Sequence, residues 1–176
     1  MSSVEHIGQS LDRAASTVTL KPSFGQRTYA SVAVVEEGLT CRIEEKSRRL
    51  VADLPRAMGG EDEGPSPSVL LRAALSSCVA MGVKMWAARR GVPIDRVEVR
   101  VETDVDARGQ LGVADAITPG FEDVRIHVFV DSLADSATLQ EIVQTSLRYS
   151  PLMDAFARSQ VMTTTTEFRT RETEAS

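Results

Sequence analysis

The chain has 176 residues, with 20 lysines and arginines against 25 aspartates and glutamates, which gives a formal net charge of -5. This length predicts a single domain that buries its core without disulfide or metal cross-links. The negative charge argues against binding of nucleic acid or an anionic membrane surface through bulk electrostatics. Two cysteines, Cys41 and Cys78, are too few for a disulfide scaffold or a cysteine zinc site, and we expect reduced thiols in the cytoplasm.

No segment is expected to cross a bilayer, because the longest apolar run, residues 69–88, is interrupted by Arg72 and Lys84. The N-terminus also lacks the basic segment and apolar core of a secretory signal. Residues 3–15 instead carry apolar side chains at helical spacing, which predicts a short amphipathic helix followed by a linker. Residues 1–27 are therefore expected to form an N-terminal helical extension.

The first half of the remaining chain predicts a three-stranded antiparallel meander. Apolar and polar residues alternate over residues 29–35, 39–44 and 50–54, and short turns separate the three runs. Residues 55–66 follow, and their acidic composition, rich in glycine and proline, is typical of a loop.

The strongest predicted element is a helix over residues 67–90. Ser66 suits its N-cap, Pro67 suits its first position, and Gly91 suits its end. At a rise of ~1.5 Å per residue, such a helix is about 36 Å long. Apolar residues cover most of its circumference, which predicts a buried central helix and favours a dimer in which two copies share one interior.

The second half of the chain predicts two further strands and two helices. Alternating residues indicate strands at 97–102 and 124–130, and helical spacing indicates a helix starting near Ser136 with a short helix after it. A final strand is expected at residues 161–168, followed by a polar tail at residues 169–176. The resulting order, βββ-α-ββ-α-α-β, defines an α+β fold.

Cys78 lies near the middle of the predicted central helix, beside Met81, Met85 and Trp86. One interpretation is a buried thiol that acts as a small hydrophobic residue, as many unpaired cysteines do. The alternative is a reactive thiol. That role requires a positive charge from another element, because the field of a helix N-terminus fades within one turn. Cys41 alternates with polar residues in its strand and is expected to fill the core.

We expect neither a metal nor a cofactor. The two histidines, His6 and His127, are isolated and show no metal-ligand spacing. The sequence contains no GxSxG nucleophile elbow, no GxxxxGK[ST] phosphate loop and no dinucleotide fingerprint.

A longer motif occupies residues 58–78, which read Met-Gly-Gly-Glu-Asp-Glu-Gly-Pro-Ser-Pro-Ser-Val-Leu-Leu-Arg-Ala-Ala-Leu-Ser-Ser-Cys. This run resembles the signature of the OsmC/Ohr family of osmotically inducible and organic-hydroperoxide-resistance proteins. A Tyr-Ser-Pro step at residues 149–151 supports the resemblance, which covers residues 28–168. It implies an OsmC-like domain that forms an intertwined homodimer, with active sites at the subunit interface.

In the peroxidase members of that family, a cysteine on the central helix attacks an alkyl hydroperoxide, and a second cysteine then forms a disulfide with it. The resemblance places the first on Cys78 and the second on Ser150, which cannot form a disulfide. It places a glutamate that holds a thiolate-stabilising arginine on the uncharged Ser68. The arginine is placed on Arg42, with Arg27 as the other candidate. The residues expected to line the substrate pocket are Met81, Met85, Trp86, Ser150 and Ser68.

Two functions follow as alternatives. The first is thiol-dependent reduction of organic hydroperoxides by a one-cysteine mechanism, in which Cys78 becomes a sulfenic acid, Arg42 stabilises the thiolate and an external thiol is the reductant. The second is a non-catalytic homodimer that binds a small hydrophobic ligand, with Cys78 as a structural residue or a slow redox sensor. Neither nucleic acid nor a membrane is an expected partner.

Overall fold

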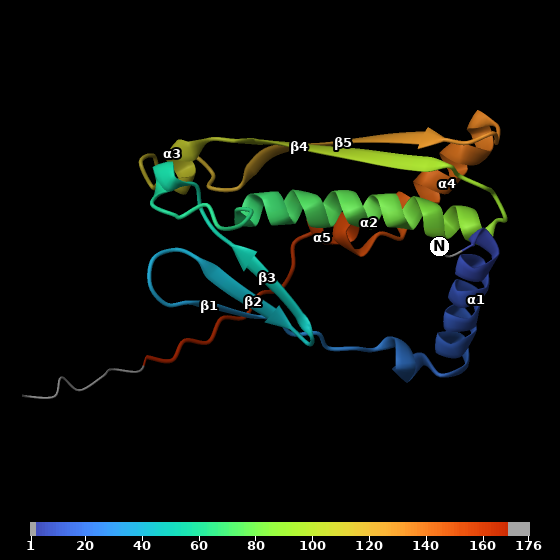
Figure 1. Ribbon diagram of the computed structural model, residues 1–176, viewed down its shortest axis with the longest axis horizontal. Helices are drawn as coiled ribbons and strands as arrows, with labels where there is room; N and C mark the ends of the chain where they lie inside the picture. The colour runs from blue at the N-terminus through green and yellow to red at the C-terminus, as the bar shows by residue number, and fades with distance from the viewer. Residues whose placement is uncertain (1–2, 169–176) are drawn as a thin grey trace, which may run out of the picture.

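The computed structural model describes residues 3–168, so the expected polar tail at 169–176 lies outside the described residues. Helices and two antiparallel sheets make up the chain (Figure 1), as the α+β prediction requires. The helices are α1 (Val4–Leu20), α2 (Pro67–Arg89), α3 (Ala107–Gln110), α4 (Ser136–Arg148) and α5 (Pro151–Ala157), with short 3-10 helices η1 (Pro22–Gly25) and η2 (Arg56–Met58). The strands are β1 (Val32–Val35), β2 (Cys41–Glu45), β3 (Arg48–Ala52), β4 (Arg96–Val105) and β5 (Phe121–Asp131).

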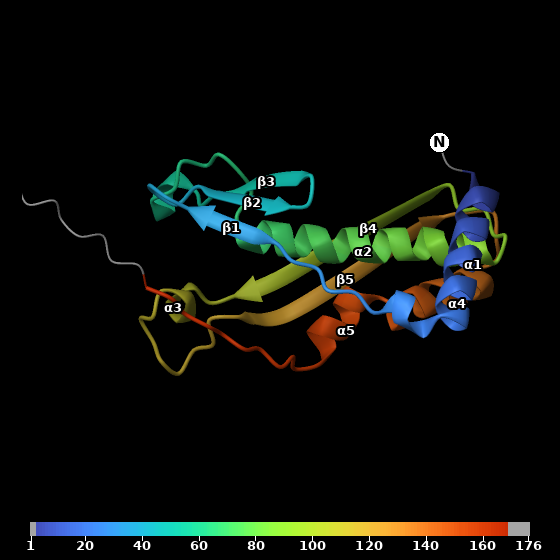
Figure 2. The ribbon, with the colours of Figure 1, turned by 90° about the horizontal axis from the view of Figure 1, so that it is seen from below.

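Helix α2 lies at the centre of the protomer, where it contacts α1, β4, α4 and α5. Seen from below, the sheet β1–β3 and helix α5 lie on opposite sides of α2 (Figure 2). The helix begins as the sequence predicts, with Ser66 extended at the N-cap and Pro67 in the first position, where its missing N–H leaves no bond unmade. Its end at Arg89 falls one residue before the predicted end.

The hairpin of β4 and β5 covers one side of α2 because its apolar residues alternate with charged ones (Figure 1). Val97 and Val128 pack against the core under this hairpin. The opposite face carries charged pairs: Arg125 contacts Glu102 at 3.4 Å and Asp104 at 2.6 Å. The hydrogen bond from Arg125 holds the pKa of Asp104 below its ordinary value.

The buried core lies between α2, α4 and the chain that enters β4. Helices α2 and α4 approach closely at Gly82, where a Cβ would lie 2.5 Å from the Oγ of the buried Ser146. The Ser146 hydroxyl donates a hydrogen bond to the carbonyl of Val79 at 3.4 Å across the same contact. The buried side chains of this cluster are Val83, Ala87, Ile94 and Ile142.

The sheet β1–β3 is packed quite differently. Its strands contact one another, but they make few contacts with the rest of the protomer. Several of its apolar side chains remain in solvent: Val35 and Leu50, on one face of the sheet, are 50% and 55% exposed. Within the described residues, this sheet therefore presents apolar side chains that no other element covers.

The loop between β3 and α2 is organised around the carboxylate of Asp53, which is 2% exposed. This carboxylate accepts hydrogen bonds from the backbone N–H groups of Leu54, Glu61 and Glu63 at 2.7, 3.2 and 3.2 Å. The hydroxyl of Thr40 donates a fourth at 3.0 Å. Burial acts to raise the pKa of Asp53, but the four hydrogen bonds together outweigh it and leave the pKa below its ordinary value of 3.8.

Two glycines of this loop lie against backbone carbonyl groups of β3 and its end. A Cβ at Gly60 would lie 1.9 Å from the carbonyl oxygen of Leu54, and one at Gly64 would lie 2.6 Å from that of Val51. Both separations are too short for non-bonded atoms, so both positions require glycine. The loop consequently delivers the chain to the start of α2 along one closely fitted path.

Two predicted elements differ from the structure. Residues 161–168 form no strand and are exposed. Their threonine-rich sequence has β propensity, but a strand also needs a neighbour to pair its backbone groups, and the described protomer supplies none there. Helix α1 runs to Leu20, past the predicted end at 15, and the hydroxyl of Thr17 donates to the carbonyl of Arg13 at 2.8 Å within it.

Helix α2 is the described helix that is long and apolar enough to cross a membrane by length and composition alone, which the sequence prediction had discounted. The core helix of a soluble protein passes the same test, so the finding is weak evidence for a span. Its two inner cations bind groups of the same chain. Arg72 donates to the hydroxyl of Thr103 at 3.1 Å, and the Lys84 ammonium donates to the carbonyl of Ile94. These contacts are typical of a helix packed within a protein.

Candidate functional site

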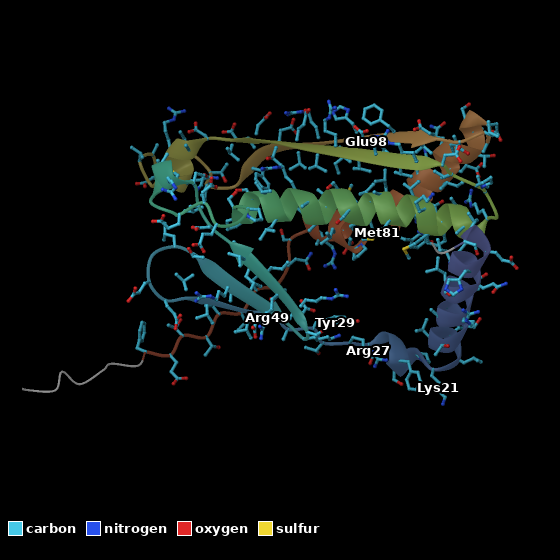
Figure 3. All side chains as sticks on the ribbon, viewed as in Figure 1. Lys21, Arg27, Tyr29, Arg49, Met81 and Glu98 are labelled. Carbon is cyan, nitrogen blue, oxygen red and sulfur yellow. The ribbon has the colours of Figure 1, made fainter. Side chains whose placement is uncertain are left out.

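Cys78 lies near the middle of α2, at the boundary between the buried and exposed faces of the helix. Its neighbours Leu75 and Val79 are fully buried and anchor the helix in the core. One turn further along, Met81 is 60% exposed, and Figure 3 shows it on the side of α2 turned away from β4. The half-buried thiol of Cys78 therefore combines a fixed position with access from the surface of the protomer.

The structure brings Ser150 to Cys78, although 72 positions separate them in the sequence. The Sγ of Cys78 lies 3.3 Å from the Oγ of Ser150, within hydrogen-bond distance. Ser150 is 5% exposed, so its hydroxyl faces the sulfur in a nearly water-free setting. Among the described residues, this hydroxyl is the hydrogen-bond partner of the sulfur, and no arginine donates to it.

The junction between α4 and α5 holds Ser150 in place. Ser150 is the N-cap of α5, and its Oγ accepts the backbone N–H of Met153 at 3.3 Å. Its own backbone N–H donates to the carbonyl of Leu147 at 3.3 Å, and Pro151 begins α5. The Tyr-Ser-Pro step of the sequence is thus a helix boundary that aims one hydroxyl at α2.

Trp86 forms part of an aromatic contact rather than a free pocket wall. Its ring lies 5.2 Å from that of Tyr149, the residue before Ser150. Arg89 lies over the Trp86 ring at 4.9 Å and also contacts Asp12 of α1 at 2.9 Å. Tyr149 was not among the residues expected at the site, although its position directly before the Ser-Pro step was a signal for it.

Met81 and Met85 line an open groove of about 560 Å³ between α1, α2 and β4. Ile7 of α1 and Val97 of β4 form the facing walls, and Lys84 lies between the methionines. Cys78 is not part of this lining. The predicted pocket residues therefore fall into two groups, with Ser150 beside the thiol and the two methionines further along α2.

Ser68 and Arg42 lie apart from the thiol in the protomer. Ser68 is the second residue of α2, ten positions before Cys78, or about 15 Å along the helix axis. Arg42 lies on β2, where it forms an exposed ion pair with Glu36 at 3.3 Å. Arg27, the other candidate, lies over the ring of Phe24 on the linker before β1 (Figure 3).

Cys41 is also a free thiol, but it lies on β2 of the sheet β1–β3 and not on α2. It is half-buried on β2, paired in register with the buried Ala52 of β3. Cys41 therefore packs within its own sheet and is not part of the described buried core around Ile142. The described residues contain no group of three or more histidine, cysteine, aspartate or glutamate side chains arranged to hold a metal.

Comparison with known proteins agrees with this fold. The family model described as OsmC-like protein matches residues 60–165, more than half of the chain. The chain therefore belongs to the OsmC-like protein family. Comparison with the curated proteins gives no match.

Several solved structures share the fold. An OsmC-like protein from Mycoplasma pneumoniae has a TM-score of 0.64 at 15% identity, covering 75% of this chain and 89% of that one. An organic hydroperoxide resistance protein OsmC from Legionella pneumophila has a TM-score of 0.55 at 20% identity, covering 74% and 91%. An organic hydroperoxide resistance protein from Elizabethkingia anophelis has a TM-score of 0.55 at 14% identity, covering 74% and 88%.

Proposed function

We propose that the protein is a cytoplasmic thiol-dependent peroxidase that reduces organic hydroperoxides by a one-cysteine mechanism. The observation that carries this proposal is the free, half-buried thiol of Cys78 at the middle of α2, 3.3 Å from a buried hydroxyl. Two of the similar structures are named organic hydroperoxide resistance proteins, which supports this substrate class.

The first step is nucleophilic attack by the Cys78 thiolate on the terminal oxygen of the hydroperoxide. The sulfur supplies two electrons, an S–O bond forms and the O–O bond breaks. The products are a sulfenic acid on Cys78 and an alkoxide, which takes up one proton to become the alcohol.

An external thiol completes the cycle, because Ser150, the residue beside Cys78, has no sulfur, and Cys41 is half-buried on β2, where it pairs with the buried Ala52. The thiol condenses with the sulfenic acid of Cys78 to give a mixed disulfide and water, and a second thiol releases the reduced cysteine. The balance is one hydroperoxide and two thiols converted to one alcohol, one disulfide and one water.

The proposal includes a homodimer, in which a second copy covers the outer face of α2 and the sheet β1–β3. Met81 on α2 is 60% exposed, and Val35 and Leu50, which share one face of the sheet, are 50% and 55% exposed. Two apolar surfaces of the described protomer therefore have no cover. A dimer also gives Arg42 a route to a thiol. Within one protomer its guanidinium binds Glu36, so in this proposal it stabilises the thiolate of the other copy.

The groove beside Met81 and Met85 favours a second candidate function. Its volume of about 560 Å³ and its largely apolar walls suit a small hydrophobic ligand. Under this alternative the homodimer is non-catalytic, and Cys78 is a packing residue or a slow redox sensor.

Intact mass spectrometry separates the two candidates. Reduced protein is exposed briefly to stoichiometric cumene hydroperoxide, with Cys78→Ser and Cys41→Ser variants beside it. The peroxidase proposal expects a rapid gain of one oxygen that is lost in Cys78→Ser, kept in Cys41→Ser and reversed by a dithiol. No gain, or equally slow modification of both cysteines, would overturn it in favour of the ligand-binding alternative.

A further inference from the structure

We infer that Ser150 is a catalytic residue of the proposed reaction, because its hydroxyl donates a hydrogen bond to the Cys78 thiolate. The inference rests on the proposed function, since it concerns the reacting sulfur. The family resemblance places the second cysteine of the peroxidases at this position, where the chain has a serine. The inference gives that serine a chemical role of its own. The distance of 3.3 Å between Oγ and Sγ places the two groups in direct contact.

The direction of the hydrogen bond follows from the surroundings of Ser150. A serine hydroxyl has one hydrogen to donate and lone pairs to accept. The backbone N–H of Met153 already donates to the Oγ at 3.3 Å, which occupies an acceptor site and leaves the hydrogen free. A thiolate can only accept, so in the reactive state the hydroxyl of Ser150 must be the donor to Cys78.

The burial of Ser150 makes this hydrogen bond effective. The residue is 5% exposed, so little water competes for its hydroxyl. Hydrogen bonds to charged groups are about twice as strong as those between neutral groups. The N-terminus of α2 is too far from Cys78 for its dipole to help, because that effect fades within a turn. In the described protomer, the serine is therefore the donor that favours the thiolate.

Serine also changes the fate of the oxidised enzyme. A cysteine at this position would attack the sulfenic acid of Cys78 and be consumed in a disulfide. The hydroxyl of Ser150 does neither, so it stays available in every state of the cycle. The oxygen of the sulfenic acid is instead released as water when an external thiol attacks the sulfur of Cys78.

The decisive variant is Ser150→Ala, studied in a Cys41→Ser background so that Cys78 is the remaining thiol. The readout is the rate of iodoacetamide alkylation of Cys78 as a function of pH. We expect alkylation near neutral pH to slow by about tenfold, because the thiolate loses a hydrogen-bond donor. Ser150→Thr, which keeps a hydroxyl, is expected to restore most of the difference.

A matched control accounts for the loss of a helix cap. Ser150→Ala also removes the N-cap of α5, and Asp135→Ala removes the N-cap of α4, where the carboxylate accepts the N–H of Thr138 at 3.0 Å. The control is expected to leave the alkylation profile of Cys78 unchanged. Equal shifts in the two variants would show a general effect of cap loss and overturn the role of Ser150.

If Ser150→Ala does not fold, a second variant tests the contact between residue 150 and Cys78. Ser150→Cys places a thiol beside Cys78, so one equivalent of hydroperoxide should produce an intramolecular disulfide, seen as the loss of two hydrogen atoms. A folded Ser150→Cys variant that keeps only an added oxygen would contradict the contact.

The outcomes distinguish this inference from the proposed function. If unmodified protein gains one oxygen on Cys78 and the alkylation profile of Ser150→Ala is unchanged, the peroxidase proposal stands and the role of Ser150 fails. If Cys78 gains no oxygen in unmodified protein, the proposed function fails, whatever the alkylation profile.

Discussion

The two sheets of the protomer have similar sequences of alternating apolar residues but very different environments. Under β4 and β5, Val97 and Val128 pack on a core that contains the fully buried Ile142. In the sheet β1–β3, Val35 and Leu50 share one face, and half or more of each side chain is exposed to solvent. Alternation alone does not distinguish the two cases, because it specifies which face is apolar and not what covers it. In our proposal, a second copy of the chain covers the exposed face of the sheet β1–β3.

The largest expected effect is on the free energy of unfolding, and it tests the buried core between α2, α4 and the hairpin of β4 and β5. Ile142→Ala removes a fully buried side chain, so we expect the free energy of unfolding to fall by about 2–5 kcal/mol through lost burial and a residual cavity. Urea unfolding at one fixed protein concentration measures it. Leu133→Ala, at a position that is 99% exposed, is the control and should change the value by less than about 0.5 kcal/mol. A loss below about 1 kcal/mol in Ile142→Ala would contradict this core.

The next largest expected effect is on dimer dissociation, and it tests the exposed face of α2. Met81→Glu places a charge on the exposed face of α2, and in the proposed homodimer this charge becomes buried. We expect dimer dissociation to become at least about tenfold easier, since an unpaired buried charge costs more than 1.4 kcal/mol. Light scattering after size-exclusion chromatography measures the mass. Phe129→Glu, on the outer face of β5, should leave the mass unchanged. A monomeric unmodified protein would refute the dimer itself.

A smaller expected effect is on the pH dependence of stability, and it concerns the loop between β3 and α2. The pKa of Asp53 is lower in the folded protein than its ordinary value of 3.8, so its contribution is complete above that pH. The contribution is lost as the pH falls through the lowered pKa, because the unfolded chain then binds more protons. Asp53→Asn should lose part of this acid sensitivity and be less stable near neutral pH. Thermal unfolding between about pH 7 and pH 2 measures it.

The control for this prediction is Asp62→Asn. Asp62 belongs to the same loop but is exposed, so its variant should retain the pH profile of the unmodified protein. If Asp53→Asn and the unmodified protein gave parallel profiles, the carboxylate would not be the group that responds to acid.

The smallest effect on stability is expected at Arg42. Its ion pair with Glu36 is exposed, and such pairs contribute about 0–1 kcal/mol, so Arg42→Ala should change the free energy of unfolding by about 0.5 kcal/mol or less. Under the proposed function the same variant should slow the oxidation of Cys78 by hydroperoxide severalfold, measured by stopped-flow or quenched mass analysis. Arg49→Ala, which breaks a similar exposed pair with Glu44, should leave the rate of Cys78 oxidation unchanged. Equal rates in both variants would remove Arg42 from the mechanism.

The elements governed by local rules were predictable from the sequence. The start of α2 follows from Ser66 and Pro67, and the hairpin of β4 and β5 follows from alternating valines. The missing strand at 161–168 was not predictable, because β propensity gives no information about a pairing partner. The end of α1 at Leu20 was missed because its last turn contains Thr17 and Thr19, whose helical propensity is poor.

The candidate site was predictable only through a resemblance. No local pattern links Cys78 to Ser150, and the family motif alone brought the two positions together before the structure gave their 3.3 Å separation. The stacking of Trp86 on Tyr149 depends on how α4 packs against α2, which periodicity does not specify. Arg42 contacts Glu36 in the connection between β1 and β2, and sequence spacing does not show which groups of other elements lie near it.

The two tightly fitted glycines have a consequence for how the family motif should be understood. Gly60 and Gly64 are required by the carbonyl oxygens of Leu54 and Val51, whatever reaction the chain performs. A descendant could exchange every reacting side chain and still have to keep both glycines in order to fold. These two positions of the signature therefore reflect the required path of the loop, whereas Cys78 and the position of Ser68 bear on the chemistry.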